Sequence, residues 1–196
     1  MDLRDFLFRT RGFTPLPFLI AALIWARYHP PLLFAGFAVA LLGELLRIHS
    51  IRFAGGATRT RQVGAPGLVT DGPYGMVRNP LYLANMLIYT GFGVASGAWF
   101  PWLPLAGLIY FGFQYGMIIS LEEYRLRELF GATYAEYCRR VPRLIPSLFA
   151  GIKGVPRYSL REALHEERRT LQSFGIAWLL LLLKLTLLIK NLEFRI

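Results

Sequence analysis

Residues 81–120 read LYLANMLIYTGFGVASGAWFPWLPLAGLIYFGFQYGMIIS and contain no Asp, Glu, Lys or Arg. The segment GAWFPW, residues 97–102, divides them into two apolar halves, each close to the ~20 residues that an α-helix needs to cross a bilayer. The stretch therefore predicts a membrane-spanning helical hairpin, with spans at Leu81–Phe100 and Trp102–Ser120. Residues 93–97 and 112–116 are small-xxx-small patterns, which let helix backbones approach closely in lipid, so we expect the two spans to pack tightly together.

Three further apolar stretches predict membrane helices, at Phe13–Tyr28, Pro31–Leu46 and Phe174–Ile189. Hydrophobic residues make up 55% of the 196 residues and charged residues only 17%, whereas soluble proteins are nearer a quarter charged. This composition excludes a disordered chain, a nucleic-acid-binding tail and most soluble enzymes. The expected fold is all-α, a polytopic membrane bundle of about five transmembrane helices in a single domain over residues 1–196, with a cofactor pocket on its cytoplasmic side.

Amphipathic segments flank the apolar stretches. Residues Asp2 to Arg11 place apolar side chains on one helical face and predict a short interfacial helix. Residues 159–162 (SLRE) form a capping-box pattern. Residues 156–196 therefore predict an amphipathic helix that begins there and leads directly into the last membrane helix.

The net charge of +10 is concentrated in two loops, one between the second and third spans and one between the fourth and fifth. Because basic loops stay in the cytoplasm, we expect both loops and the amino terminus inside and the carboxyl terminus outside. The predicted location is the cytoplasmic membrane of a bacterium or archaeon. The single cysteine, Cys138, excludes an intrachain disulfide and a cysteine-based zinc site, and no metal is expected.

Polar residues with defined local roles mark the two loops. Pro80 suits the first position of the third span, which puts Asn79 at its N-cap with a side-chain oxygen for the free amides. Glu122 and Glu123 follow the fourth span and point about 100° apart on a helix. Carboxylates at the hydrocarbon boundary cost a few kcal/mol unless they are paired or solvated. The pattern leaves open whether they pair with an arginine of the loops or bind a ligand.

The combination of motifs resembles the isoprenylcysteine carboxyl methyltransferases and the related membrane phospholipid methyltransferases. Those proteins carry Arg-His-Pro-x-Tyr at a helix start, Glu-Glu about forty residues later, and then Phe-Gly-x-x-Tyr-x-x-Tyr-x-x-x-Val-Pro. The matching residues here are Arg78-Asn79-Pro80-Leu81-Tyr82, Glu122-Glu123, and Phe130-Gly131-Ala132-Thr133-Tyr134 with Tyr137, Val141 and Pro142. The resemblance covers residues 43–155.

The resemblance implies an integral-membrane methyltransferase that takes S-adenosylmethionine from the cytosol and a lipophilic acceptor from the bilayer. Carried over position by position, the implied cofactor contacts are Gly67, Leu68, Val69, Tyr74, Asn79, Pro80, Leu81, Tyr82 and Glu122. Of these, Asn79, Tyr82 and Glu122 are the implied catalytic positions. A carboxylate such as Glu122 can accept the ribose hydroxyls or attract the ammonium group, and a tyrosine face can stabilise a sulfonium.

Two departures from the motif concern the acceptor. Asn79 stands where relatives carry His, and it cannot titrate near neutrality, so no general base is expected there. Ile118 stands where the prenylcysteine enzymes carry an Arg that meets the acceptor's carboxylate, which weakens a carboxyl-methylating assignment. Arg47 and Arg125 are the candidate replacements. Glu44 is expected either to pair with Arg47, three residues later, or to line the acceptor tunnel.

Three alternatives remain beside this reading. They are a phospholipid amine N-methyltransferase, a steroid-reductase-like enzyme that uses NADPH, and a non-enzymatic membrane protein that binds lipid. The expected partners are membrane lipids and a lipophilic acceptor, with no nucleic acid. The sequence leaves the methylated atom and the oligomeric state open.

Overall fold

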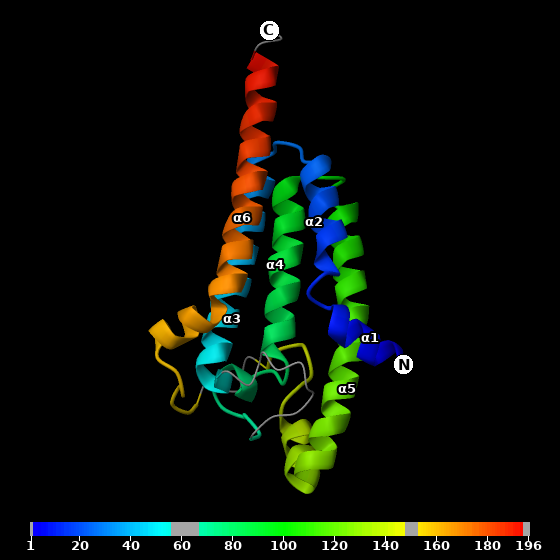
Figure 1. Cartoon of the computed structure of the whole chain (residues 1–196), viewed down its shortest axis with the longest axis vertical. Helices are drawn as coiled ribbons and strands as arrows, with labels where there is room; N and C mark the ends of the chain where they lie inside the picture. The colour runs from blue at the N-terminus through cyan, green and yellow to red at the C-terminus, as the bar shows by residue number, and fades with distance from the viewer. Residues whose placement is uncertain (1, 56–66, 148–152, 194–196) are drawn as a thin grey trace.

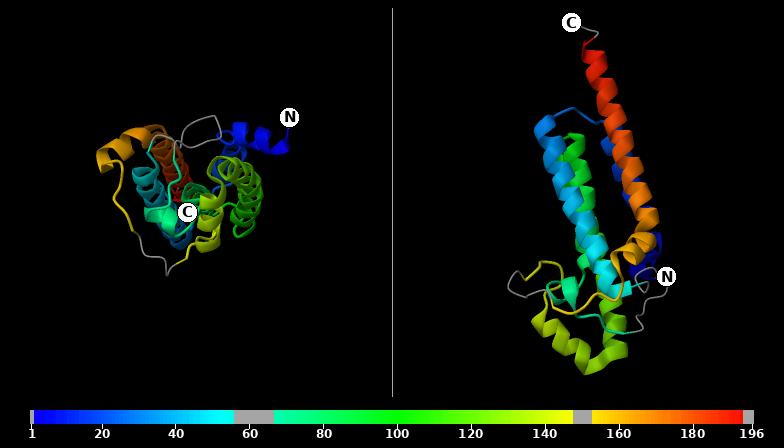
Figure 2. Two further views of the ribbon diagram at one scale, coloured as in Figure 1. Left: turned by 90° about the horizontal axis from the view of Figure 1, so that it is seen from below. Right: turned by 90° about the vertical axis from the view of Figure 1, so that its left-hand side faces the viewer.

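A computed structural model of the chain describes residues 2–55, 67–147 and 153–193. Within these ranges the chain is helical and contains no strand, which confirms the predicted all-α class. Helices α2 to α6 run side by side in an elongated bundle (Figures 1 and 2). The elements are α1 (Leu3–Thr10), α2 (Pro15–Ile24), α3 (Pro30–Ala54), the 3-10 helix η2 (Gly72–Gly75), α4 (Pro80–Ser96), α5 (Trp102–Arg140) and α6 (Leu160–Glu193).

Helix length and composition decide which elements can cross a membrane. Among the described residues, α3, α5 and α6 are long and apolar enough, and α1 with α2 would add a fourth span if this pair, bent by 53°, is one broken span. Helix α4 has 17 residues, about 25 Å of rise against a hydrocarbon core of about 30 Å. It ends early because Gly97 adopts the left-handed conformation (φ 62°) that terminates helices. The structure thus supports an integral-membrane bundle of three or four full spans, with α4 packed among them.

Several helices continue past the apolar stretches that predicted them. Helix α3 extends to Ala54 and α5 to Arg140, because a helix leaving the membrane needs no apolar side chains to keep its backbone hydrogen bonds. The φ and ψ of Gly131 (49° and −122°) break α5, and the segment after it turns back toward the loops (Figure 1). The capping box is confirmed, since the Ser159 amide donates to Glu162 Oε2 at 2.8 Å and the Glu162 amide donates to Ser159 Oγ at 3.3 Å.

The closest backbone approach joins α3 to α4. A Cβ atom added to Gly91 would lie 2.5 Å from the Ala40 amide nitrogen, and one added to Gly43 would lie 2.8 Å from the Ala84 carbonyl oxygen. Small residues of α3 and α4 face each other there and bring the two backbones together. Helices α4 and α5 also pack together, as predicted, but through aromatic rings such as Tyr89 and Phe111, whose centroids lie 4.6 Å apart; a Cβ on Gly116 of α5 would meet open space.

Both basic loops lie at one end of the bundle and the α4–α5 turn lies at the other, as the charge distribution predicted (Figure 1). Backbone hydrogen bonds join the loops: the Arg78 amide donates to the Pro142 carbonyl at 2.9 Å, and the Gly72 amide donates to the Lys153 carbonyl at 2.7 Å. The side of the membrane that this end faces stays a prediction. Two of the arginines behind that prediction, Arg59 and Arg61, lie outside the described residues.

Candidate active site

A cavity of about 1290 Å³ lies between the helices on the side of the joined loops. This volume exceeds the ~300–1,000 Å³ of most small-molecule sites, so the cavity has room for more than one ligand. Every residue that the resemblance assigned to the cofactor lines it. These residues are Gly67, Leu68, Val69, Tyr74, Asn79, Pro80, Leu81, Tyr82 and Glu122.

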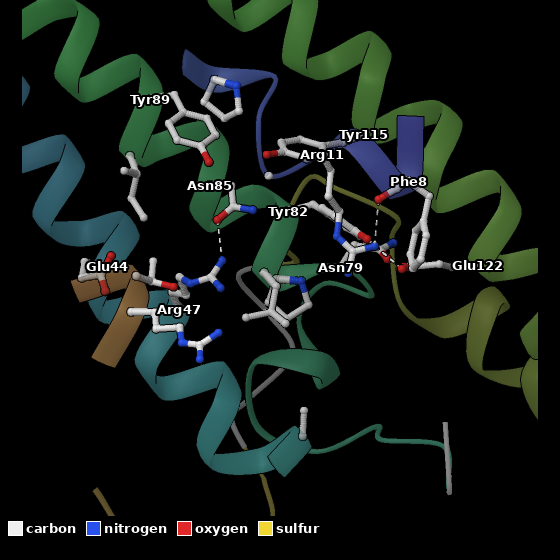
Figure 3. A pocket seen from close by; sticks show the side chains of 18 of the residues that line it. Phe8, Arg11, Glu44, Arg47, Asn79, Tyr82, Asn85, Tyr89, Tyr115 and Glu122 are labelled. Atoms are coloured by element: carbon white, nitrogen blue, oxygen red, sulfur yellow. Dashed lines mark hydrogen bonds between the residues drawn. The ribbon is translucent and has the colours of Figure 1, made fainter. Parts of the chain in front are cut away.

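Glu122 and Tyr82 form a direct contact at one end of the cavity (Figure 3). The Tyr82 hydroxyl donates to Glu122 Oε1 at 2.7 Å, which fixes the carboxylate against the first turn of α4. The Tyr82 ring also packs against that of Tyr115, with ring centroids 4.9 Å apart. Figure 3 places Arg11 beside this pair, where its guanidinium lies 3.8 Å from the Phe8 ring centroid. This end of the cavity therefore holds a carboxylate, a phenol and a nearby cation.

Glu123 turns away from the cavity, as its position on the helix predicted. Its carboxylate lies 3.1 Å from Arg78 Nη2 and 3.4 Å from Arg143 Nε, and the residue is buried. The prediction that Glu123 pairs with an arginine of its own cytoplasmic segment is confirmed by Arg143, and Arg78 adds a partner from the first loop. Glu122 is therefore the member of the pair that faces the cavity.

Asn79 occupies the N-cap position of α4, as predicted, but the predicted capping by its side chain was wrong. Its side chain makes no capping hydrogen bond, and its Nδ2 instead donates to the Arg143 carbonyl at 3.0 Å. The Asn79 side chain therefore links the two loops, because the second loop passes directly beside the start of α4. Pro80 does occupy the first turn of α4, as predicted. The helix start therefore faces the cavity without a side-chain cap, an arrangement that favours an anionic ligand group.

Aromatic side chains of η2 and of the last part of α5 form a wall of the cavity. Tyr74, Tyr134 and Tyr137 line it, and the Tyr137 hydroxyl donates to the Tyr74 carbonyl at 2.7 Å. Burial raises the pKa of the Tyr74 phenol, so this phenol stays neutral and acts as a hydrogen-bonding group and a flat surface. Of these three tyrosines, only Tyr74 was predicted from the sequence as a cofactor contact.

A second polar group lies at the opposite side of the cavity, where Figure 3 labels Glu44 and Arg47. Arg47 donates to both carboxylate oxygens of Glu167 on α6, at 2.9 and 3.2 Å, and to Asn85 Oδ1 at 2.5 Å. The predicted pair of Glu44 with Arg47 was therefore wrong, because the Arg47 guanidinium pairs with Glu167 of α6 instead. The alternative prediction, that Glu44 lines the tunnel, agrees with its place in the cavity wall.

Two predicted substrate contacts lie away from the cavity. Ile118 is fully buried where α1 crosses α5, among Leu7 and Phe8. Arg125 is exposed on the outer face of α5. Neither residue is part of the cavity wall as the structure describes it.

Three residues of the α4 wall and its surroundings were not predicted from the sequence. Asn85 and Tyr89 line the cavity together with Tyr82 and are spaced at i, i+3 and i+7 along α4. This helical spacing of polar side chains inside an apolar stretch was a usable signal. Tyr115 of α5 gave no such signal, because only the packing of α5 against α4 places it there.

Apolar side chains of α2 and α6 complete the cavity. Leu16 and Leu19 line it from α2, and Phe174, Ala177 and Trp178 line it from α6. The first and last apolar helices contribute to the cavity because they pack together with α4, through Ala22, Phe92 and Trp178 in one buried cluster.

Comparison with known proteins gives related matches over the core of the chain. Residues 32–133 match the model of a family described as phospholipid methyltransferase. Similar curated proteins include a cobalt-zinc-cadmium resistance protein of Cupriavidus metallidurans, 37% identical over 81 residues, which are 41% of this chain and 36% of the relative. A nickel-cobalt-cadmium resistance protein of Alcaligenes xylosoxydans xylosoxydans is 34% identical over 83 residues, 41% of this chain and 37% of the relative.

A third relative has a named enzymatic activity. Protein-S-isoprenylcysteine O-methyltransferase B of Arabidopsis thaliana is 31% identical over 115 residues, 57% of this chain and 57% of the relative. In each case the match spans less than two thirds of the relative's own length. The family model ends within α5, before the loop that follows this helix and before α6.

Proposed function

Because this chain belongs to the phospholipid methyltransferase family, we propose that it is an integral-membrane methyltransferase that uses S-adenosylmethionine to methylate a lipophilic acceptor. One observation carries the proposal. The residues assigned to the cofactor from separate sequence motifs all line one cavity, whose other walls include apolar side chains of α2 and α6. A single cavity with a polar end and an apolar side suits the transfer of a methyl group from a charged cofactor to a lipid-soluble molecule.

The residues at the Glu122 end fit the chemical groups of S-adenosylmethionine. Glu122 would accept hydrogen bonds from the ribose hydroxyls or pair with the ammonium group, and the uncapped start of α4 would receive the carboxylate. The tyrosine faces of the wall would stabilise the positive sulfur by about 1 kcal/mol through cation–π attraction. When bound, the cofactor supplies an electrophilic methyl group on a sulfonium.

The protein's own contribution to the reaction is alignment and exclusion of water. The hydrogen bond of Tyr82 to Glu122 and the ion pairs of Glu123 hold the start of α4 and the middle of α5 in register. The apolar side chains of α2 and α6 would hold the acceptor's lipophilic part and remove water from its nucleophilic atom. Holding the two reactants in line lowers the activation free energy of methyl transfer, and no covalent intermediate on the protein is needed.

The charged side chains of the cavity bear on which lipophilic molecules the protein methylates. The Arabidopsis relative is named for O-methylation of isoprenylcysteine, while the family description names phospholipids. In this chain, Ile118 lies outside the cavity and Arg47 is already paired with Glu167. These two facts argue against recognition of an acceptor carboxylate by either position.

Cofactor binding tests the proposal against its rivals. The purified protein in nanodiscs is titrated with S-adenosylhomocysteine, the demethylated cofactor, and separately with NADPH. We expect saturable binding of S-adenosylhomocysteine and none of NADPH. Binding of NADPH alone would favour the reductase-like reading, and binding of neither would favour a non-enzymatic lipid-binding protein.

A further inference from the structure

Arg11 brings a positive charge to the Glu122 end of the cavity. It lines the cavity from the bend between α1 and α2, and Figure 3 shows its guanidinium beside Tyr82 and Glu122. The charge of Arg11 interacts electrostatically with both of these side chains. Arg9 of α1 also lines the cavity but is exposed, whereas Arg11 is half-buried. This end of the cavity therefore presents a cation and an anion side by side.

The two charges stand next to each other without forming an ion pair. Within the described part of the chain, no carboxylate lies within ion-pair distance of the Arg11 guanidinium. The guanidinium donates one hydrogen bond, to the Phe8 carbonyl at 3.4 Å, and stacks on the Phe8 ring. Stacking occupies its face, so most of its N–H donors remain available to a ligand. Glu122 accepts from Tyr82 through one oxygen and has further acceptor sites.

Contacts with α5 on both sides of Arg11 fix its position. Before it, Leu7 and Phe8 are buried against α5 in one apolar cluster. After it, the Thr14 hydroxyl donates to the Arg11 carbonyl at 3.2 Å and accepts from Gln114 Nε2 at 2.8 Å. Gln114 is a fully buried residue of α5. Arg11 is therefore held against the same helix that carries the carboxylate.

A ligand with both charges on one carbon atom would satisfy the two side chains at once. S-adenosylmethionine ends in an α-amino acid, which carries an ammonium group and a carboxylate in this arrangement. Arginine matches a carboxylate with two parallel N–H groups, and charge-assisted hydrogen bonds of this kind are stronger than neutral ones. The uncapped start of α4 lies at the same end, because Tyr82 belongs to its first turn, and its amides would add to the same attraction.

We propose that Arg11 binds the carboxylate of the cofactor's amino-acid end, beside the ammonium group at Glu122. The proposal rests on the function proposed above and narrows the role of Glu122 from ribose or ammonium to ammonium. It also adds a specificity-determining residue from the segment that joins α1 and α2. This segment lies outside residues 32–133, which match the family model.

Three ligands separate the two halves of this contact. They are S-adenosylhomocysteine, its analogue without the carboxylate and its analogue without the amino group, each titrated calorimetrically onto the protein in nanodiscs. The wild type should bind S-adenosylhomocysteine at least about tenfold more tightly than either analogue. Arg11→Gln should weaken binding of S-adenosylhomocysteine and of the deaminated analogue about tenfold or more, and leave the decarboxylated analogue within about twofold. Glu122→Gln should show the reverse pattern, sparing the deaminated analogue.

The matched control is Arg4→Gln, which removes an arginine of α1 that pairs with Asp2 and is not part of the described cavity wall. It should leave all three affinities within about twofold, well short of a tenfold change. Binding of S-adenosylhomocysteine by Arg11→Gln as by the wild type overturns the proposal. An equal loss of all three ligands overturns it too, because Arg11 would then act on the fold.

Two further outcomes concern the ligands themselves. If the wild type binds the decarboxylated analogue as tightly as S-adenosylhomocysteine, the carboxylate has no partner and the proposal fails. If Glu122→Gln weakens binding of both analogues equally, the amino-acid end does not lie at Glu122 and the proposal fails as well. If the wild type binds none of the three ligands, the proposed function on which the proposal rests is overturned instead.

Discussion

Replacing Glu122 by Gln should weaken cofactor binding while leaving the fold intact. The Glu122 carboxylate accepts the Tyr82 hydroxyl at 2.7 Å and lines the cavity. The replacement amide keeps an oxygen for Tyr82, so the local geometry should persist. What disappears is the negative charge and one acceptor facing the ligand.

The size of the effect follows from that single loss. A hydrogen bond to a charged group contributes about 1.5–3 kcal/mol, which corresponds to a rise of about 10- to 150-fold in the Kd of the cofactor. Folding should change little, because a neutral amide is easier than a carboxylate to hold near lipid. Calorimetric titration with S-adenosylhomocysteine, together with the thermal midpoint of the same sample, measures both quantities.

The neighbouring residue provides the comparison. Glu123 has the same side chain one position later, but it faces Arg78 and Arg143 instead of the cavity. Its replacement by Gln should leave the Kd within about twofold, well short of the tenfold change that ~1.4 kcal/mol produces. If Glu122→Gln binds S-adenosylhomocysteine like the wild type, Glu122 is not a cofactor contact and the assignment of this end of the cavity fails.

Three further predictions concern packing, ion pairing and orientation. Glu123→Gln should lower the free energy of unfolding by about 1–3 kcal/mol, seen as a lower thermal midpoint, because it leaves two arginines without their shared carboxylate. Gly91→Val should destabilise the bundle by about 1–3 kcal/mol or more, since its Cβ would meet the α3 backbone; Gly116→Ala, where the structure leaves open space, should not lower the midpoint, because Ala also favours the helix. Reporter fusions after Arg157 and after Arg195 should report the cytoplasm and the outside respectively, and the reverse result would invert the proposed topology.

The sequence was sufficient for the parts of the fold and site that depend on local pattern. Apolar stretches located the bundle helices, and SLRE at residues 159–162 located the start of α6 through side chains that bond within one turn. The residues that the resemblance assigned to a cofactor all line one cavity, because the start of α4 and the second half of α5 lie at the same end of the bundle (Figure 1). Glu122 and Glu123 point in different directions, as expected for adjacent helical residues, which are 100° apart around the helix axis.

What the sequence did not reveal depends on contacts between distant segments. Arg47 had an acidic neighbour three residues earlier, but its partner is Glu167, which only the packing of α6 against α3 brings near. Asn79 had the residue type of a helix cap, but the Arg143 carbonyl from the other loop takes its amide. Ile118 had the spacing of a cavity residue, but α1 folds over it. In each case a local rule was outweighed by a neighbour more than sixty residues away in sequence.

The central claim is methyl transfer from S-adenosylmethionine to a lipid-soluble molecule, and label transfer measures it directly. The protein in nanodiscs is incubated with S-adenosylmethionine labelled at the methyl group and a total lipid extract, and organic-soluble products are then identified by mass. We predict labelled species in the organic phase that depend on protein and are strongly reduced with Glu122→Gln. Label confined to the unreacted cofactor, while S-adenosylhomocysteine binds normally, would contradict the claim that this cavity methylates a lipophilic acceptor.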